Sequence, residues 1–496
     1  MKPQFMMEES GMRASLPVGL QWQVQEMDWV LPGGARNATI RARLQNPDLI
    51  HPNLYKNWLG KAVGIYDPQG ERIWHGWLAQ IDLQVGRVNY RWDLEQVYSK
   101  VIARYPQVSA VLDPYHAWAY GDWMQDEVLM SEIGAKEQLI SLTYGNASSA
   151  GQVARQTLNQ HKIISQRAML QPESTEDVQL RIQARGWWQR LAWRLDESRQ
   201  GILAHLPGGK SQQLFGLSGN AKLAQSFLCT TDDFALGQIC LRMALIGAPQ
   251  DEVIVKVCSD ASGQPGATLA SSSLPAMQLQ GGWQWLVWEL DPPLSLNINQ
   301  QYWFIVERST SLDALNHYSI ESDDGRGYAN GVCLRWNGSG WLNTGQDLRF
   351  ALLAVAESTQ LIRDVGQLAV GDGVLKGVQV WQESGLFLPY WRAPEMTRLE
   401  RMEEWLQLGC SDQSPLNALV NAEGTLEVFN LPRGNPTPLQ LDRQGRLMAM
   451  AGAELALPLD LLGQTFHFPQ EIQSQPQVLR GLRWTPEGGL FPLITD

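Results

Sequence analysis

Apolar side chains alternate with mostly polar ones over an unusually long stretch in the first third of the chain. From Ile73 to Val85 every second residue is apolar, apart from His75. A period of two places successive side chains on opposite faces of a β-strand, so this stretch predicts one long strand. The segment 61–66 and the turn sequence 67–70 (Asp-Pro-Gln-Gly) predict a shorter strand joined to it as a hairpin. A sheet must therefore form around this segment.

The length of the chain, 496 residues, predicts two to four domains. A hydrophobic fraction of 44% with 18% charged residues is typical of globular proteins. The sequence has no uncharged apolar run of about 18 residues, so no membrane insertion through a helix is expected. Glu8 and Glu9 stand where a signal peptide would need an apolar core, so secretion by that route is not expected.

The formal net charge of −12 argues against non-specific binding of nucleic acid. Residues 1–206 contain 21 basic and 21 acidic side chains, residues 207–358 contain 8 and 14, and residues 359–496 contain 10 and 16. The change near residue 206 indicates a domain boundary. We therefore expect a mainly β, multi-domain protein with domains at 1–206, 207–358 and 359–496.

Within the first range, apolar residues at helical spacing predict a helix over 94–105, capped by Asp93 and ended by Pro106. A second helix is expected from 148 or 149 to about 161, and a strand over 178–184. In the last range we expect a Gly-rich β segment containing Gly366, Gly371, Gly373 and Gly377, a helix over 394–409 and a hairpin over 416–430.

The middle of the chain has the composition of an all-β domain. Residues 204–221 are rich in Gly, Pro and Ser, which predicts a linker. From 222 to 358, short strand-like runs are separated by clusters of turn residues, a pattern typical of a β-sandwich.

No pattern of residues indicates catalysis, a cofactor or a metal site. The five cysteines form no CxxC pair and are expected to be reduced and buried. The seven histidines lack metal-ligand spacing, and His75 is expected to be a core imidazole. Residues 207–211 resemble the end of a phosphate-binding loop, but Ala204 stands where that motif requires glycine. Asp313, His317 and Ser319 lie too close in sequence to predict a triad.

Residues 222–358 resemble the choice-of-anchor type of β-sandwich found in bacterial surface proteins and phage virion proteins. The likeness rests on segments 224–227, 236–239, 253–259 and 301–306, and above all on 262–274, where Gly263, Pro265 and Gly266 form a tight connection. The resemblance implies a jelly-roll-like module used for adhesion or display rather than catalysis.

The flanking parts resemble tail-tip and baseplate hub proteins of tailed phages. This likeness rests on segments 63–67 and 76–81, on the Trp-rich segment 185–194, and on the helix and hairpin near the end. It implies β-barrel and α+β parts that form rings around the tail lumen, with the sandwich inserted between them. The first 20 and last 40 residues match loosely, which leaves the ring-forming surfaces unassigned.

We therefore expect a virion structural protein of a phage tail, assembled in the host cytoplasm, which forms homo-oligomers and binds other tail proteins. The alternatives are a cellular adhesion or carbohydrate-binding protein and a tail-associated hydrolase. Contact of the sandwich with a host surface glycan would use Asp323 and Asp324 as acceptors for sugar hydroxyls, and Tyr328, Trp336 and Trp341 as stacking faces. As alternatives to glycan contact, Asp323 and Asp324 are solvated turn residues or hold calcium. Trp336 and Trp341 are more simply explained as residues that close the end of the sandwich.

Overall fold

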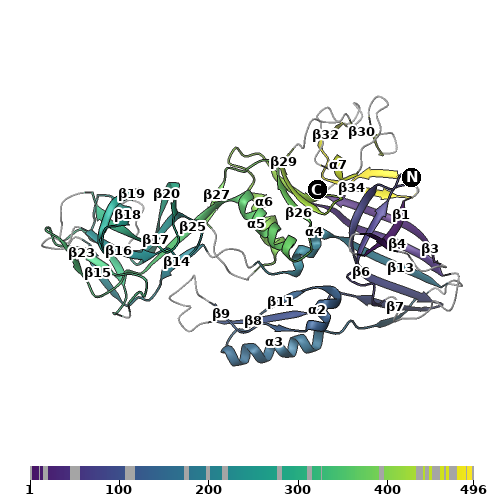
Figure 1. Cartoon of the computed structure of the whole chain (residues 1–496), viewed down its shortest axis with the longest axis horizontal. Coiled ribbons are helices and arrows are strands. Elements are labelled where there is room, and N and C mark those ends of the chain that lie inside the picture. Colours follow the sequence, from purple (N-terminus) through teal and green to yellow (C-terminus); the bar gives the residue numbers. More distant parts are fainter. Residues whose placement is uncertain are drawn as a thin grey trace. The chain divides into compact units, whose positions relative to one another are not determined.

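The computed structural model describes residues 3–9, 12–14, 20–44, 56–106, 118–172, 178–196, 201–214, 222–275, 282–309, 315–325, 327–389, 396–431, 439–441, 446–449, 458–462, 465–467, 477–486 and 489–493. The fold is mainly β, as the sequence predicts, and contains several sheets (Figure 1). The chain divides into two compact units. Unit 1 consists of Met1–Asp196, Ser358–Leu386 and Ala393–Asp496, and unit 2 consists of Glu197–Glu357 and Phe387–Arg392. The first and last thirds of the chain therefore fold together rather than as separate consecutive domains.

The largest sheet of unit 1 has 14 strands, drawn from both ends of the chain. Its strands are β1 (Gln4–Glu9), β2 (Met12–Ala14), β3 (Leu20–Val30), β4 (Gly33–Leu44), β5 (Ala62–Tyr66), β6 (Arg72–Val85), β7 (Val88–Asp93), β12 (Arg167–Leu170), β13 (Gln179–Gly186), β26 (Gly377–Val380), β28 (Leu416–Val420), β29 (Thr425–Asn430), β34 (Gly481–Thr485) and β35 (Gly489–Pro492). The predicted hairpin is confirmed as β5 and β6, the strand over 178–184 as β13, and the hairpin over 416–430 as β28 and β29.

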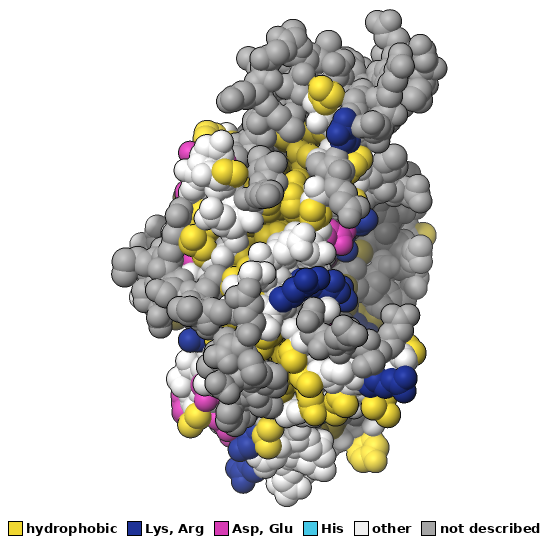
Figure 2. Space-filling model, turned by 90° about the vertical axis from the view of Figure 1, so that its right-hand side faces the viewer, with side chains coloured by type: hydrophobic (Ala, Val, Ile, Leu, Met, Phe, Trp, Pro, Cys, Tyr) yellow, Lys and Arg dark blue, Asp and Glu magenta, His cyan; other side chains and the backbone are white. Residues whose placement is uncertain are grey.

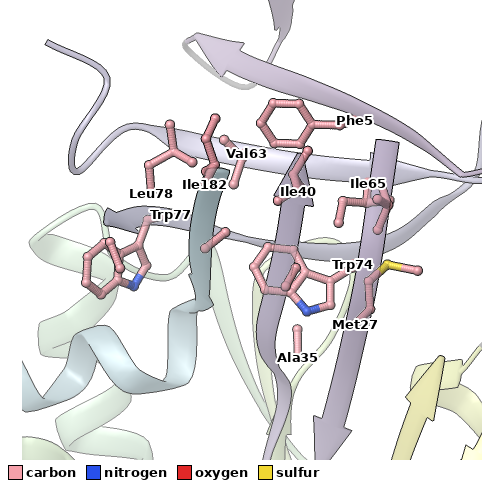
Figure 3. Packing of buried hydrophobic residues seen from close by; sticks show 14 of the residues in the cluster. Phe5, Met27, Ala35, Ile40, Val63, Ile65, Trp74, Trp77, Leu78 and Ile182 are labelled. Atoms are coloured by element: carbon pink, nitrogen blue, oxygen red, sulfur yellow. The ribbon is translucent and has the colours of Figure 1, made fainter. Parts of the chain in front are cut away.

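Six neighbouring strands of this sheet curl around the core of unit 1. Their order is β1, β5, β6, β13, β4 and β3. The first and last of them meet again, because the rings of Phe5 on β1 and Trp22 on β3 are 5.1 Å apart. Side chains from all six strands converge on one interior, with the fully buried Trp74 near its centre (Figure 3). The register of β6 shifts between Gln80 and Leu78, where it pairs with β13, and most side chains on both faces of β6 are buried.

A four-stranded sheet packs with helices beside the large sheet. It consists of β8 (Lys100–Pro106), β9 (Trp118–Tyr120), β10 (Met124–Gln125) and β11 (Glu137–Ser141), and α2 (Glu127–Ile133) lies between the last two in sequence. Helix α3 (Ala147–His161) confirms the second predicted helix and packs Ala150 and Ala154 against β8 (Figure 1). A second four-stranded sheet contains β30 (Leu439–Leu441), β31 (Leu447–Ala449), β32 (Thr465–His467) and β33 (Gln477–Val478), near α7 (Pro458–Leu461).

The helix predicted over 94–105 is wrong, because 94–99 form turns and irregular backbone and 100–105 belong to the strand β8. Val101 and Ala103 are fully buried, and β8 pairs with β9, β10 and β11. The Asp93 carboxylate accepts the N–H of Glu95 in a turn, so it caps no helix. Pairing with strands that come later in the chain outweighs a helical spacing that extends over only three turns.

The Gly-rich β segment is also wrong over most of its length, because α5 (Ser358–Gly371) is a helix. Its buried side chains include Leu361, Ile362 and Val365, which share one face. A Cβ at Gly366 would lie 2.7 Å from Cγ2 of Val378, so the glycine allows α5 to approach β26 closely. The helix predicted over 394–409 is confirmed as α6 (Arg398–Leu408), with Gly409 as its C-cap; Pro394 lies outside the described residues.

Unit 2 is a β-sandwich of two antiparallel sheets. One contains β14 (Ile202–His205), β15 (Lys210–Leu214), β17 (Phe234–Ile246), β20 (Gln284–Leu296), β22 (His317–Ser322), β25 (Phe350–Glu357) and β27 (Phe387–Pro389). The other contains β16 (Lys222–Leu228), β18 (Val253–Asp260), β19 (Pro265–Leu274), β21 (Gln301–Arg308), β23 (Cys333–Trp336) and β24 (Trp341–Asn343). The sheets meet through Phe304 and Phe350, whose rings are 5.2 Å apart.

The linker predicted over 204–221 is wrong over its described part. β14 pairs with β25 and β15 pairs with β22, so both segments are strands of the sandwich.

The five cysteines are free and buried, as expected. In unit 1, the short helix α4 (Trp187–Arg190) and a 3-10 turn (Leu191–Trp193) follow β13 directly. No helix in the described ranges is long and apolar enough to cross a membrane.

Candidate functional site

Asp323 does not lie on the surface that a glycan could reach. Its side chain is fully buried, and its carboxylate accepts hydrogen bonds from the backbone N–H groups of Gly325, Gly327 and Asp347 and from Nε2 of His205 at 3.0 Å. Burial raises the pKa of the Asp323 carboxyl group. The hydrogen bonds lower this pKa by more than burial raises it, so it lies below the usual range. Asp323 therefore organises the loop at the end of the sandwich, and only the neighbouring Asp324 is exposed.

The three aromatic candidates are half-buried against the sandwich. Tyr328 stacks edge-on against Phe350 at 5.3 Å and lies beside His205. The rings of Trp336 and Trp341 are 5.4 Å apart, and Trp341 packs on the small cluster that includes Trp303. These contacts are what closing the end of a sandwich requires. Contact of the aromatic residues and Asp324 with a glycan stays a prediction.

The described residues around 323–324 do not include a group of acidic, His or Cys side chains arranged as calcium ligands. Among the described residues, no group of three His, Cys, Asp or Glu side chains is arranged to hold a metal ion. The oxygens of Asp323 already accept four hydrogen bonds, which is the arrangement of a structural carboxylate. His317 and Ser319 lie on β22, while Asp313 lies outside the described residues.

His75 is a buried imidazole within a polar network of unit 1. Its Nε2 accepts a hydrogen bond from Trp187 at 2.9 Å, and it lies 3.5 Å from Oε2 of Glu8. Glu8 also accepts hydrogen bonds from the Tyr66 hydroxyl at 2.6 Å and from Arg72 at 3.3 Å. Burial raises the pKa of Glu8, but the surrounding donors and positive charges together lower it to about 2. The prediction of a core imidazole is confirmed.

A cleft of about 530 Å³ lies in unit 1 between β11 and the large sheet. Its walls come from β6, β7, β11, β13, the turn after β7 and the start of α6. The lining includes four glutamines and several charged and aromatic side chains, among them Gln80, Gln138, Gln183, Gln189, Trp77, Trp193, Tyr98, Lys136 and Glu137. Nothing in the sequence predicted this cleft, because its walls come together only when β8 and β11 form a parallel pair.

Lys136 is held at the floor of the cleft. Its ammonium donates to the backbone carbonyls of Leu94 and Glu95, and it lies 5.2 Å from the ring centroid of Tyr98 and 5.4 Å from that of Trp193. Burial lowers the pKa of Lys136 to about 8. Its contacts stabilise the turn that leads into β8, which is where a helix was expected.

Glu137 is also fully engaged. Its Oε1 lies 2.9 Å from Nζ of Lys100 and 3.2 Å from Nε of Arg194, and its Oε2 accepts the N–H of Leu195 at 2.9 Å. Two other residues that line the cleft have a buried polar atom without a partner among the described residues: Nε1 of Trp77 and Oε1 of Gln189. Buried donors and acceptors are normally satisfied, so these two atoms are exceptions in the core beside the cleft.

A second hollow, of about 610 Å³, lies on unit 1 beside Trp22 and Trp484. The charged residues that line its described part are Arg41 and Arg43. On the face shown in Figure 2, hydrophobic side chains reach the surface beside Lys and Arg side chains.

Comparison with known proteins gives no family for this chain. No family model and no curated protein matches it. Among solved structures with some similarity is a glycoside hydrolase family 43 arabinoxylan arabinofuranohydrolase from Bacillus subtilis in complex with cellotetraose. The match has 9% sequence identity and a TM-score of 0.17, and covers 57% of this chain and 63% of that one, which is less than two thirds of the enzyme. A TM-score this low carries no argument about fold or activity.

Proposed function

We propose that the chain is a structural subunit of a phage tail tip or baseplate, in which unit 1 assembles with copies of itself and other tail proteins. One observation carries the proposal. Strand β28 pairs with β4, and β34 pairs with β3, so both ends of the chain build one sheet while 197–357 fold as a separate sandwich. This topology, together with the barrel-like core, is what the resemblance to hub proteins with an inserted display module implies.

Strand β12 offers an edge through which unit 1 can assemble. Among the described strands it pairs with β7 alone, and all four of its residues are exposed. Leu170 on this strand is 82% exposed. An exposed apolar strand edge readily accepts a strand from another subunit. In the proposed assembly, β12 is a contact between neighbouring subunits.

The proposal is tested by locating the protein in virus particles. Antibody fragments raised against 222–357 are added to virions from cells that carry the gene, and the particles are imaged by electron microscopy. We expect label at the tip of the tail. Label on the cell surface instead would support the adhesion alternative, and purified virions that contain no such chain would refute the proposal.

The role of β12 is tested by placing a charge on the edge. Leu170→Lys should reduce incorporation of the protein into particles, because a lysine on a strand edge opposes pairing. Leu269→Lys changes a leucine of unit 2 that is 44% exposed and serves as the matched control. Equal incorporation of the two variants would show that β12 is not a contact.

The outward contact of the sandwich with a host glycan is tested separately. A glycan array probed with the full chain should give binding that Asp324→Ala weakens, because Asp324 is the exposed carboxylate of the predicted set. Asp323→Ala is not a valid probe, since Asp323 organises the loop itself. If the array shows no binding, the predicted glycan contact is refuted, whereas the proposed structural role is not affected.

A further inference from the structure

We propose that the cleft beside β11 binds an extended segment of another polypeptide, which adds as a strand to the free edge of β11. This inference does not depend on the proposed role in a phage tail. Among the described strands, β11 pairs with β8 alone. Four of its five residues, Glu137, Gln138, Leu139 and Ser141, line the cleft. The open side of the strand therefore faces the hollow, and a strand of five residues matches a segment about 17 Å long.

Two residues that line the cleft have a buried polar atom whose missing partner is a group that a peptide backbone contains. Trp77 is 3% exposed, and its Nε1 donor has no acceptor among the described residues. The buried Oε1 of Gln189 has no donor there. A peptide group supplies one carbonyl and one N–H, which are the two kinds of partner that these atoms lack.

The charges around the cleft favour a segment without strong net charge. The lining contains the acidic residues Asp93, Glu95, Glu137 and Glu400 and the basic residues Arg104, Lys136 and Arg185. Glu137 and Lys136 are already engaged with groups of this chain. A phosphorylated or nucleic-acid ligand would need an excess of basic groups, whereas acidic residues outnumber basic ones in the described lining.

The aromatic residues of the cleft argue against a sugar as the occupant. Trp77 and Trp193 are 3% and 6% exposed. The guanidinium of Arg190 lies 4.4 Å from the ring centroid of Trp193 and 5.8 Å from that of Trp77, and Lys136 also lies over Trp193. A bound sugar stacks on an exposed ring face, and these faces are already covered. The half-buried glutamine amides and the strand edge are better suited to a peptide.

The experiment selects peptides from a filamentous-phage library of random segments, each about twelve residues long so that it exceeds the strand it must match. The library is selected on the full-length protein. Selected peptides are synthesised with a fluorophore, and their dissociation constants are measured by fluorescence anisotropy. Hydrogen exchange of the protein with and without peptide locates the bound segment. We expect slower exchange of the Leu139 and Ser141 amides on binding, because alternate N–H groups of β11 face β8 and strand addition protects those on its open side.

Three variants test the location. Gln183→Trp fills the cleft from β13 and should raise the dissociation constant at least about tenfold, equivalent to about 1.4 kcal/mol. Gln189→Met removes the unpartnered acceptor and should raise it about fivefold, the effect of one hydrogen bond. Gln179→Trp is the matched control, since Gln179 lies on the same strand outside the cleft lining, and should change it less than about twofold.

Unfolding midpoints of the three variants show whether each is folded. If Gln183→Trp does not fold, the Gln189→Met variant and the exchange data decide the outcome. Failure to select any peptide, unchanged binding to both cleft variants, or protection outside β11 would overturn the proposal. A glycan array that shows binding abolished by Gln183→Trp, with no peptide selected, would identify the occupant as a sugar and also overturn it.

Discussion

Two glycines of unit 1 allow neighbouring backbones to touch. A Cβ at Gly186 would lie 1.7 Å from the carbonyl oxygen of Ala35, and one at Gly76 would lie 2.0 Å from that of Arg185. Both obstacles are backbone atoms of paired strands, which cannot rotate away. The glycines are therefore required by the close approach of β4, β6 and β13 at the point where β13 turns into α4.

Replacing Gly186 by alanine should destabilise unit 1 strongly. We expect Gly186→Ala to lower the free energy of unfolding by about 3 kcal/mol or more, because strands of the sheet must separate to admit the methyl group. Gly340→Ala adds a methyl group where no atom lies within 4 Å and should change stability by less than about 0.5 kcal/mol. Urea denaturation of both variants measures the difference, and equal effects would contradict the close approach.

The Glu8 carboxylate should contribute to stability in a pH-dependent way. Its pKa is lowered from 4.5 to about 2, so its contribution is present above pH 4.5 and is lost as pH falls towards 2. Glu8→Gln should lower the free energy of unfolding by about 3 kcal/mol at neutral pH, with a smaller difference near pH 2. Urea denaturation across this pH range checks the trend. A difference between the proteins that is independent of pH would show that Glu8 is not the titrating group.

At the scale of elements, α6 begins with a capping box that can be tested directly. The Thr397 side chain accepts the N–H of Glu400, and the Glu400 carboxylate accepts the N–H of Thr397 at 2.7 Å. Thr397→Ala should cost about 1 kcal/mol, and the double variant with Glu400→Ala should cost less than the sum of the single changes.

Glu404→Ala is the control for this cap. Glu404 lies further along α6, is half-exposed and forms an ion pair with Arg401, so its loss should change stability by less than about 0.5 kcal/mol. Chemical denaturation of the four proteins measures the effects. Strict additivity of Thr397→Ala and Glu400→Ala would show that the reciprocal bonds are not formed.

At the scale of the whole molecule, the two units should unfold as separate cooperative blocks, because each has its own core. Ile182→Val in unit 1 and Ile320→Val in unit 2 remove one methylene group each from fully buried positions. Each should cost about 1 kcal/mol and lower only one transition by about 2–4 °C. Differential scanning calorimetry reports both transitions. A single transition shifted equally by both variants would show that the units unfold together.

Local patterns predicted many elements correctly. Alternation predicted β6 and β13, and turn residues predicted the hairpins β5–β6 and β28–β29. A helical stripe with a terminal glycine predicted α6. In each case the signal lies within a few neighbouring residues, because the faces of a strand or helix follow directly from its own period.

The remaining features depend on partners that are distant in the chain. Segment 94–105 has helical spacing, but its second half forms β8, which pairs with β9, β10 and β11. Gly366 was expected to lie in a β segment. It lies in the helix α5, where the absence of a side chain allows close approach to Val378 of the sheet. Asp323 was expected to be solvated, but its carboxylate is buried and accepts hydrogen bonds from His205 and Asp347. The sequence by itself determined the periods and the turns. Tertiary structure decided which faces were covered and built the cleft at β11, because burial and long-range pairing depend on residues that no local pattern contains.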